Sequence, residues 1–473
     1  MTSTAGTGPG IDWELAGAEC VEHLRALIRI PSVNPPGLAD GAGGRDSTGG
    51  ETAAAAYCAE VLTSAGIAAE VLEPAPGRGS CFGRLPATVP DPEPPLVLLS
   101  HIDVVPVDLE SWSHDPFGGE LIDSVIWGRG AVDMKDMVAM ELSVMLALAR
   151  SAAERRRDVI FAAVADEEAG GLFGALHWVR TRPELFGDAL GRPAAAALNE
   201  VGGYSMTVRG RRIYGIQVAE KGIAWTRMTT TGTTGHGSMP HPDNAAIKLA
   251  EAVTRLAATT QAMRITPVVD AFLVALGLGA VADRVRGGDE AGAFAALDAL
   301  IDDPVLRRSL AAMLRDTVTP NMIHSGKKMN VIPGSGEAEI DVRTLPGTDQ
   351  EALLAAMQAT VGELARIEPV ILMPPTEAPA DAPIVDLMRR ALLDADPEAL
   401  VAPMMITPGT DAKALALLGI PTYGFAPLRL DADTPFLSLF HGHDERLPVS
   451  ALRFGLPVLH EVVSRFVEAT EPR

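Results

Sequence analysis

The sequence predicts an α/β protein with a doubly wound, largely parallel sheet. Three short apolar runs lack polar alternation, as strands covered on both faces do: Leu96–His101, Val159–Glu168 and Ala194–Glu200. Expected strands and helices alternate along the chain up to Gly203, which is typical of this fold class. Each run also ends at a histidine or an acid. Because ligands bind beyond the carboxyl ends of strands in such sheets, we expect these side chains to converge there.

The helices of the first domain follow from start and stop signals in the sequence. A helix is expected at Trp13–Ile28, before a group of prolines. A glycine-rich loop, Gly37–Gly50, precedes a second expected helix at Glu51–Ala65. A third helix is expected over Asp136–Ala153, after a glycine-rich turn. These helices alternate with the strands, as a doubly wound domain requires.

The pattern changes beyond Lys221. A strand with one buried face is expected at Ala224–Thr231, followed by a helix at Asn244–Ala258. A long Ala/Leu-rich helical region is expected from there to about Leu314, and a further strand at Gly336–Arg343. The α/β character returns near Val385–Leu393, Gly419–Phe425 and a closing helix at Ser450–Val467. We therefore predict a discontinuous α/β domain, residues 1–221 and 379–473, and an inserted α+β domain, residues 222–378.

Composition limits the classes of function. The 473 residues carry a formal net charge of −22, which argues against nucleic-acid or anionic-membrane partners. The three cysteines are too few for a disulfide framework. Neither a signal peptide nor an apolar stretch of transmembrane length is visible in the sequence. These features predict a cytoplasmic protein without nucleic-acid or membrane partners.

Several side chains at or near the strand ends could bind a metal, although each has another explanation. His101 and Asp103 are two residues apart on a strand and share one side, which suits an imidazole ligand held by a carboxylate. Asp133 could cap a helix, and Glu200 could be a surface acid. In the adjacent pair Glu167-Glu168, one acid can bind a metal while the other moves protons. His441 has a competing histidine, His443, two residues on.

The order of six motifs is more specific than any one of them. They are His101-x-Asp-Val-Val-Pro, Gly128-Arg-Gly-x-x-Asp-Met-Lys, Asp166-Glu-Glu-x-x-Gly, Asn199-Glu, Gly235-His-Gly-Ser-x-Pro and His441-x-x-Asp-Glu. Together they resemble the dinuclear zinc peptidase family of acetylornithine deacetylase, succinyl-diaminopimelate desuccinylase, aminoacylase-1 and glutamate carboxypeptidase. The resemblance runs from Val21 to Val467.

The resemblance implies a set of metal ligands and two divalent ions. One ion would be held by His101, Asp133 and Glu200, and the second by Asp133, Glu168 and His441, with Asp133 as the bridge. His441 is favoured over His443 because it alone has the spacing of the family motif. Zinc is the expected metal, with Co²⁺ or Mn²⁺ as alternatives. The family also has a cis peptide after the bridging acid, here Asp133–Met134.

The resemblance also implies roles in catalysis and substrate binding. The discontinuous α/β domain would be the catalytic domain, and the inserted domain, residues 222–378, would be a lid or dimerisation domain. Glu167 is expected to be the general base and Asp103 to orient His101. His236 would stabilise the oxyanion, reaching across a homodimer in dimeric members of the family. Arg343 would hold the carboxylate of the substrate, and Asn330, Gly409 and Thr410 match positions that line the same pocket.

The expected activity is hydrolysis of the amide bond in N-acyl amino acids or in short peptides with a free carboxylate. The segment near Ile265–Thr319 resembles the branch with carboxypeptidase S and the N-acyl amino acid hydrolase. One alternative is a deacylase of a single metabolite such as N-acetylornithine or N-succinyl-diaminopimelate. A non-catalytic peptide-binding scaffold is another alternative, although Glu167 and all five ligand positions are present.

Overall fold

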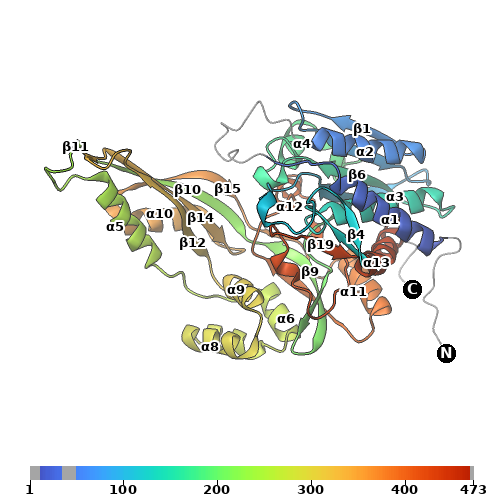
Figure 1. Cartoon of the computed structure of the whole chain (residues 1–473). Helices are drawn as coiled ribbons and strands as arrows, with labels where there is room; N and C mark the ends of the chain where they lie inside the picture. The colour runs from blue at the N-terminus through green and yellow to red at the C-terminus, as the bar shows by residue number, and fades with distance from the viewer. Residues whose placement is uncertain (1–10, 35–49, 469–473) are drawn as a thin grey trace.

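The computed structural model describes residues 11–34 and 50–468, so nearly all of the expected glycine-rich loop lies outside the described residues. The helices at both ends of the described chain, α1 (Trp13–Ile28) and α13 (Val449–Val467), pack on a larger sheet. A smaller sheet, formed by strands between Gly222 and Met373, projects away from it and is called the arm below (Figure 1). Strand β11 (Gly235–His236) lies at the far end of this arm. Within the described residues, no helix is both long and apolar enough to cross a membrane.

The larger sheet is a ten-stranded mixed sheet with parallel strands at its centre. Its central strands β6, β3, β7 and β18 run parallel, and the strands that flank these four, β2 and β9, pair with them antiparallel. The strands of the main path, in spatial order, are β1 (Ala68–Leu72), β2 (Ser80–Leu85), β6 (Arg157–Val164), β3 (Glu93–His101), β7 (Ala196–Asn199), β18 (Thr422–Gly424), β9 (Arg211–Glu220) and β16 (Thr376–Glu377). Strands β8 (Ser205–Val208) and β17 (Leu400–Ile406) also pair with β9. The predicted α/β class is confirmed.

Both faces of this sheet are covered, which explains the apolar runs. In β3, Leu96 and Leu98 belong to one buried cluster, whereas Val97 and Leu99 belong to a second cluster on the other face. The first face is covered by α1 (Trp13–Ile28), α2 (Glu51–Ser64), α3 (Lys135–Arg150), α11 (Pro383–Ala395) and α13 (Val449–Val467). The second face is covered by α4 (Ala175–Thr181) and α12 (Ala412–Ala416).

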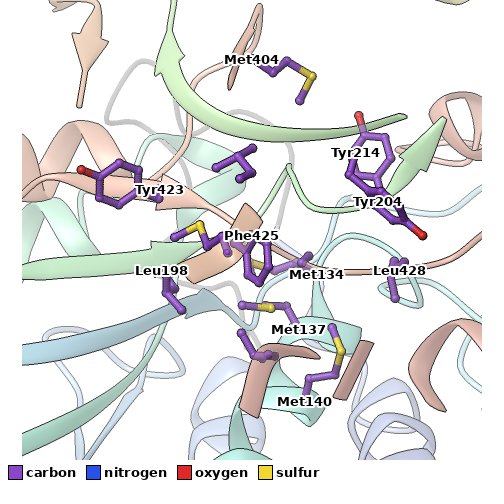
Figure 2. Packing of buried hydrophobic residues seen from close by; sticks show 14 of the residues in the cluster. Met134, Met137, Met140, Leu198, Tyr204, Tyr214, Met404, Tyr423, Phe425 and Leu428 are labelled. Carbon is purple, nitrogen blue, oxygen red and sulfur yellow. The ribbon is translucent and has the colours of Figure 1, made fainter. Parts of the chain in front are cut away.

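The first cluster has a methionine-rich layer. Met134, at the start of α3, and Met137 and Met140 within it lie close to Phe425, which follows β18 (Figure 2). All four side chains are almost fully buried. Unbranched methionine side chains can fill the irregular space between a helix and the sheet above it.

Two expected elements extend three or more residues beyond the C-terminal ends that the structure shows. The strand predicted to reach Glu168 ends at Val164, because Asp166 adopts a left-handed conformation with φ of 70° and turns the chain. Glu167 and Glu168 therefore lie on a short 3-10 turn. The helix predicted to end at Ala153 ends at Arg150, where the Arg155 guanidinium donates a hydrogen bond to the Leu148 carbonyl.

The arm is built on a four-stranded antiparallel sheet in the order β12 (Thr317–Ser325), β14 (Ser335–Thr344), β10 (Gly222–Thr231) and β15 (Arg366–Met373). Helices α5 (Ala245–Ala257) and α10 (Gln350–Val361) cover one face of this sheet. Burial alternates along β10 and β14, as expected for strands with one covered face. At the far end, β11 pairs with β13 (Val331–Ile332).

The helical region between the arm strands packs elsewhere. It forms α6 (Pro267–Ala275), α7 (Gly279–Arg286), α8 (Glu290–Leu300) and α9 (Pro304–Ala312). Their buried residues belong to the same cluster as the larger sheet, and α6 lies against β17. Residues 265–314 thus pack with the larger domain although the chain reaches them from the arm. The domain limits at 222 and 378 stay a prediction.

Candidate metal centre

The carboxyl ends of three neighbouring parallel strands bring the expected ligands together. His101 is the last residue of β3, Glu200 follows β7 directly, and Glu168 lies on the turn after β6. Because β6, β3 and β7 are adjacent in the sheet, these side chains meet at one edge. Asp133 and His441 reach the same place from loops.

The side chains form two groups that share Asp133. His101, Asp133 and Glu200 offer ligand atoms within 4.8 Å of one another, and so do Asp133, Glu168 and His441. The His101 Nε2 atom lies 3.2 Å from Asp133 Oδ1, whereas the His441 Nε2 atom lies 3.3 Å from Asp133 Oδ2. One carboxylate oxygen therefore faces each group, which is the geometry that a bridging ligand needs. His443 belongs to neither group.

The donor set fits two divalent cations. Imidazole nitrogens and carboxylate oxygens are the ligands that zinc takes in catalytic sites. Glu168 Oε1 is buried and accepts no hydrogen bond from the described residues, so it has a free lone pair for a cation. Four acids, with Glu167 among them, and two histidines share the site, and such crowding of carboxylates is costly unless cations offset it.

The protonation tendencies of the groups reflect this crowding. Burial raises the pKa of Glu167 well above its usual value, and the charges of Glu200, Asp411 and Glu168 raise it further. Burial and the charge of Asp133 raise the pKa of Glu168 to about 7. Hydrogen bonds to Asp133 and Glu168 raise the pKa of His441 to about 10. Divalent cations would favour the ionised carboxylates and the neutral imidazoles instead.

The loop that carries Asp133 is held by a carboxylate from the last motif. Glu445 is fully buried, and its Oε1 accepts hydrogen bonds from the backbone N–H groups of Val132, at 2.7 Å, and Asp133, at 3.1 Å. Its Oε2 accepts from Gly130 N and from the Arg129 guanidinium. The peptide bond Asp133–Met134 is cis, as the resemblance implied. Glu445 thus fixes the backbone on which the shared ligand sits.

Asp103 contacts more of the site than a histidine orienter alone would. The His101 Nδ1 atom lies 3.0 Å from the Asp103 carbonyl oxygen and 3.4 Å from its carboxylate Oδ1. The same carboxylate accepts hydrogen bonds from the backbone N–H groups of Glu167 and Glu168, both at 3.1 Å. Asp103 therefore links His101 to the turn that carries the two glutamates.

The metal groups open into a cavity of about 920 Å³ between the larger domain and the arm. Among the expected substrate residues, Arg343 of β14 and the loop residues Gly409 and Thr410 line this cavity. Arg343 donates to Asp341 at 2.7 Å and lies over the Trp225 ring. Much of the remaining wall is apolar, including Phe272 of α6 and other residues: Tyr204, Met206, Leu306, Met313, Leu437 and Phe440.

The structure does not bring His236 and Asn330 to this cavity. His236 lies in β11 at the far end of the arm (Figure 1), and Asn330 is beside it, with its carbonyl accepting from Gly237 N at 2.8 Å. The His236 side chain is exposed, and its Nδ1 lies 2.8 Å from Ser238 Oγ. These two residues lie near each other at the end of the arm, but within one chain they are separate from the metal groups.

Some residues that support the site were not singled out from the sequence. Asn34 donates to Asp103 at 2.7 Å, and Arg78 donates to Asp166, the acid that precedes the two glutamates. Neither residue lies in a motif, so no local pattern indicates them. Glu445 did have a signal, since it ends the His-x-x-Asp-Glu motif, but its part in holding the Asp133 loop appears only in three dimensions.

Comparison with known proteins agrees with this geometry. The family model described as peptidase family M20/M25/M40 matches residues 97–465. The probable carboxypeptidase S-like 2 of Dictyostelium discoideum is 26% identical over 385 residues, which are 75% of this chain and 68% of that protein. Aminoacylase-1 of Sus scrofa is 28% identical over 428 residues, covering 87% of this chain and 89% of the relative.

A solved structure shows the same fold. The M20 family metallo-carboxypeptidase from Sulfolobus solfataricus superimposes with a TM-score of 0.68 at 16% identity, over 94% of this chain and 98% of that one. The fold and the paired ligand groups define a metal-dependent hydrolase that cleaves amide bonds. The chain belongs to peptidase family M20/M25/M40, whose model matches most of its length.

Proposed function

We propose that this chain hydrolyses the amide bond of N-acyl amino acids, or of short peptides with a free carboxylate, at a dinuclear metal centre. The observation that carries the proposal is the sharing of Asp133, whose two oxygens face His101 and His441 separately. The relatives named aminoacylase-1 and carboxypeptidase S-like 2 support this class of substrate.

The side chains have separable roles in the proposed reaction. Two divalent cations bound by the five ligands would polarise the scissile carbonyl and acidify water. Glu167 accepts the proton of the attacking water and returns it to the leaving amine nitrogen, which breaks the C–N bond. Asp103 holds His101 and the backbone of Glu167 in place. The first transfer makes the water a better nucleophile, and without the second the nitrogen would have to leave as an anion, which is a poor leaving group.

The cavity supports recognition of a carboxylate and an apolar group. Arg343 can present its planar guanidinium to a carboxylate through two hydrogen bonds. Gly409 packs against the Lys413 side chain, and a Cβ atom at residue 409 would lie 2.7 Å from Lys413 Cε. A larger residue would therefore displace Lys413, whose side chain also lines the cavity. The apolar wall favours a hydrophobic acyl group or amino-acid side chain over a strongly polar one.

The proposal extends to metal, assembly and location. We propose two zinc ions, with Co²⁺ or Mn²⁺ as substitutes, because the donors are two imidazoles and three carboxylates. We propose a homodimer in which the partner subunit's His236 stabilises the oxyanion. Cytoplasmic location is supported by Cys20, Cys58 and Cys81, which are buried free thiols.

The test is the Glu167→Gln variant of the zinc-loaded protein. The amide keeps the size of the side chain but cannot accept the proton, so turnover should fall by about 100-fold or more. Metal content, measured by atomic emission, should stay at the wild-type value. Released amine is measured on matched N-acetyl amino acids, their carboxamides and dipeptides. Loss of metal in the variant would mean that Glu167 is a ligand and not the base.

The same substrate panel separates the alternatives. Cleavage of N-acetyl amino acids but not of their carboxamides would support carboxylate recognition by Arg343. No cleavage of any panel member, with metal bound, would favour a deacylase for a single metabolite. If wild type and Glu167→Gln bound peptides equally and neither turned them over, the chain would be a binding scaffold.

A further inference from the structure

Behind the metal centre, and away from the cavity, lies a buried group of acids with one basic residue at its middle. Glu51, Asp103 and Asp166 have exposed fractions of 0%, 0% and 1%. Arg78, which precedes β2, is 3% exposed. Among the described residues, Arg78 is the only Lys or Arg that forms an ion pair with Glu51 or Asp166.

Arg78 uses its two terminal nitrogens for different partners. The Nη1 atom donates to Glu51 Oε2 at 2.9 Å. The Nη2 atom donates to Asp166 Oδ1 and to Asn34 Oδ1, the latter at 3.3 Å. The guanidinium also lies over the Phe173 ring, 5.6 Å from its centroid. A planar fork with several donors suits these three directions, which one ammonium group would not reach together.

Two partners of Arg78, Asp166 and Glu51, form hydrogen bonds with the loop that carries Glu167 and Glu168. Asp166 is the left-handed residue that begins the turn of Glu167 and Glu168, and its Oδ2 accepts a hydrogen bond at 2.9 Å from Phe173 N, in the loop that follows this turn. Glu51 Oε1 accepts from Asp166 N at 3.2 Å. The start of the turn and the loop that follows it are thus hydrogen-bonded to the two acids that pair with Arg78.

The third partner leads to Asp103. Asn34 receives a hydrogen bond from Arg78 on its oxygen and donates from its nitrogen to Asp103 Oδ2 at 2.7 Å. Asp103 in turn accepts from the backbone of Glu167 and Glu168. Arg78 therefore contacts neither the cavity nor a proposed metal ligand, yet one intermediate residue connects it to the turn and to Asp103.

We infer that Arg78 is a positioning residue: its guanidinium fixes the Glu167–Glu168 turn and the Asp103 carboxylate for metal binding and proton transfer. The part that concerns catalysis rests on the proposed function, and the part that concerns metal retention does not. Residues that orient metal ligands typically affect metal affinity or activity by 10- to 100-fold when they are replaced.

The test compares Arg78→Lys and Arg78→Met with a matched control, Arg155→Met. Arg155 is also a buried arginine, but its guanidinium donates to the backbone carbonyls of Leu148 and Pro86, and it lies outside the site. For each zinc-loaded protein we would measure zinc retained against a graded chelator, urea unfolding, kcat and KM. The zinc readout does not depend on knowing the substrate.

The inference predicts that the Arg78 variants lose zinc affinity and kcat, whereas the Arg155 variant loses only stability. Arg78→Lys should keep the charge but lose the fork, so kcat and zinc affinity should each fall by about 10-fold or more, with KM changed by less than about threefold. Arg155→Met should lower stability and leave zinc affinity and kcat near the wild-type values. If Arg78→Met does not fold, Arg78→Lys decides.

Two outcomes would overturn the inference. In one, Arg78→Lys retains wild-type zinc affinity and kcat. In the other, Arg78→Lys loses them only in proportion to its unfolded fraction, as a purely structural residue would. If wild type hydrolyses no tested substrate, the proposed function fails, and the zinc measurement alone still decides whether Arg78 positions the ligand turn.

Discussion

Asp133 is the residue on which both ligand groups depend. Asp133 is 8% exposed, and its carboxylate lies between His101 and His441, with one oxygen toward each. Burial opposes its ionisation, but hydrogen bonds from the two histidines outweigh that cost and lower its pKa. The neighbouring backbone is held by Glu445. A shared, ionised and fixed carboxylate is what two adjacent cations require.

Because both ligand groups share Asp133, replacing it and replacing His441 should give different metal contents. His441→Ala removes one ligand from the second group alone, so metal content should fall from two ions towards one ion per chain. Asp133→Asn removes charge from both groups, so both ions should be lost or bound weakly. Atomic emission after gel filtration gives the content. His443→Ala is the control and should retain both ions; a His441→Ala protein with two tightly bound ions would contradict the assignment.

Motif order was enough to predict which residues the structure brings together in the two candidate ligand groups, because His101, Glu168 and Glu200 lie at or just after the ends of recognisable strands. Their role as metal ligands stays a prediction. Motif order was not enough to predict the buried residues that hold these side chains in place, such as Arg78. Arg78 and Asp166 are 88 residues apart, and Arg78 and Glu51 are 27 apart. A buried ion pair of this kind is set by how the chain folds back, and no local pattern in the sequence marks it.

At the scale of elements, strands were predicted well where both faces are buried and less well at their ends. The β3 run is apolar because Leu98 and Leu99 are covered on opposite faces. The end of β6 was placed too late because Asp166 leaves the strand conformation for a left-handed turn stabilised by Arg78 and Phe173. Propensity does not reveal such a turn, since its partners come from elsewhere.

The packing of α1 against α13 predicts a pH dependence. His460 of α13 lies edge-on to Trp13 of α1, with ring centroids 5.1 Å apart, and burial lowers its pKa to about 4. In the unfolded chain this pKa is about 6.5. Below pH 6.5 the unfolded state therefore binds a proton that the folded state excludes, and stability is lost as pH falls from 6.5 towards 4.

The measurement is urea unfolding at pH 7.5 and pH 5.5. Between these values, wild type should lose about 1 kcal/mol more free energy of unfolding than His460→Phe, which cannot take up the proton. His177→Phe, on α4, is the control and should keep the wild-type dependence. Equal dependence in wild type and His460→Phe would mean that His460 is hydrated or protonated in the folded protein.

At the scale of the whole molecule, the arm separates two parts of the predicted site. The chain leaves the larger sheet through Lys221, whose buried ammonium donates to the carbonyls of Ala312 and Arg315. It returns through β15 and β16. Arg343 near this junction lines the cavity, whereas His236 lies at the other end of the arm. The sequence predicted both residues for one site but could not give their separation within one chain.

That separation predicts that His236 serves the cavity of a second copy. His236→Ala and Glu167→Gln should each be nearly inactive, since one lacks the oxyanion donor and the other the base. In a mixed dimer, the Glu167→Gln subunit still supplies His236 to the intact Glu167 of its partner. Mixing the two folded variants, so that their dimers exchange subunits, should therefore restore part of the activity, up to about one active site per mixed dimer.

The mixing experiment distinguishes this arrangement from closure of the arm within one chain. If His236 acted on its own cavity, every subunit in the mixture would still lack either the histidine or the base, and activity would stay at the sum of the two variants. The control is a mixture of His236→Ala with an Asp133→Asn/His236→Ala double variant, in which no subunit supplies the histidine. Sedimentation at the assay concentration would show whether dimers form. His236 is exposed and does not line the cavity of its own chain. Recovery of activity in the first mixture, but not in the control mixture, would therefore show that His236 acts in the cavity of the second copy.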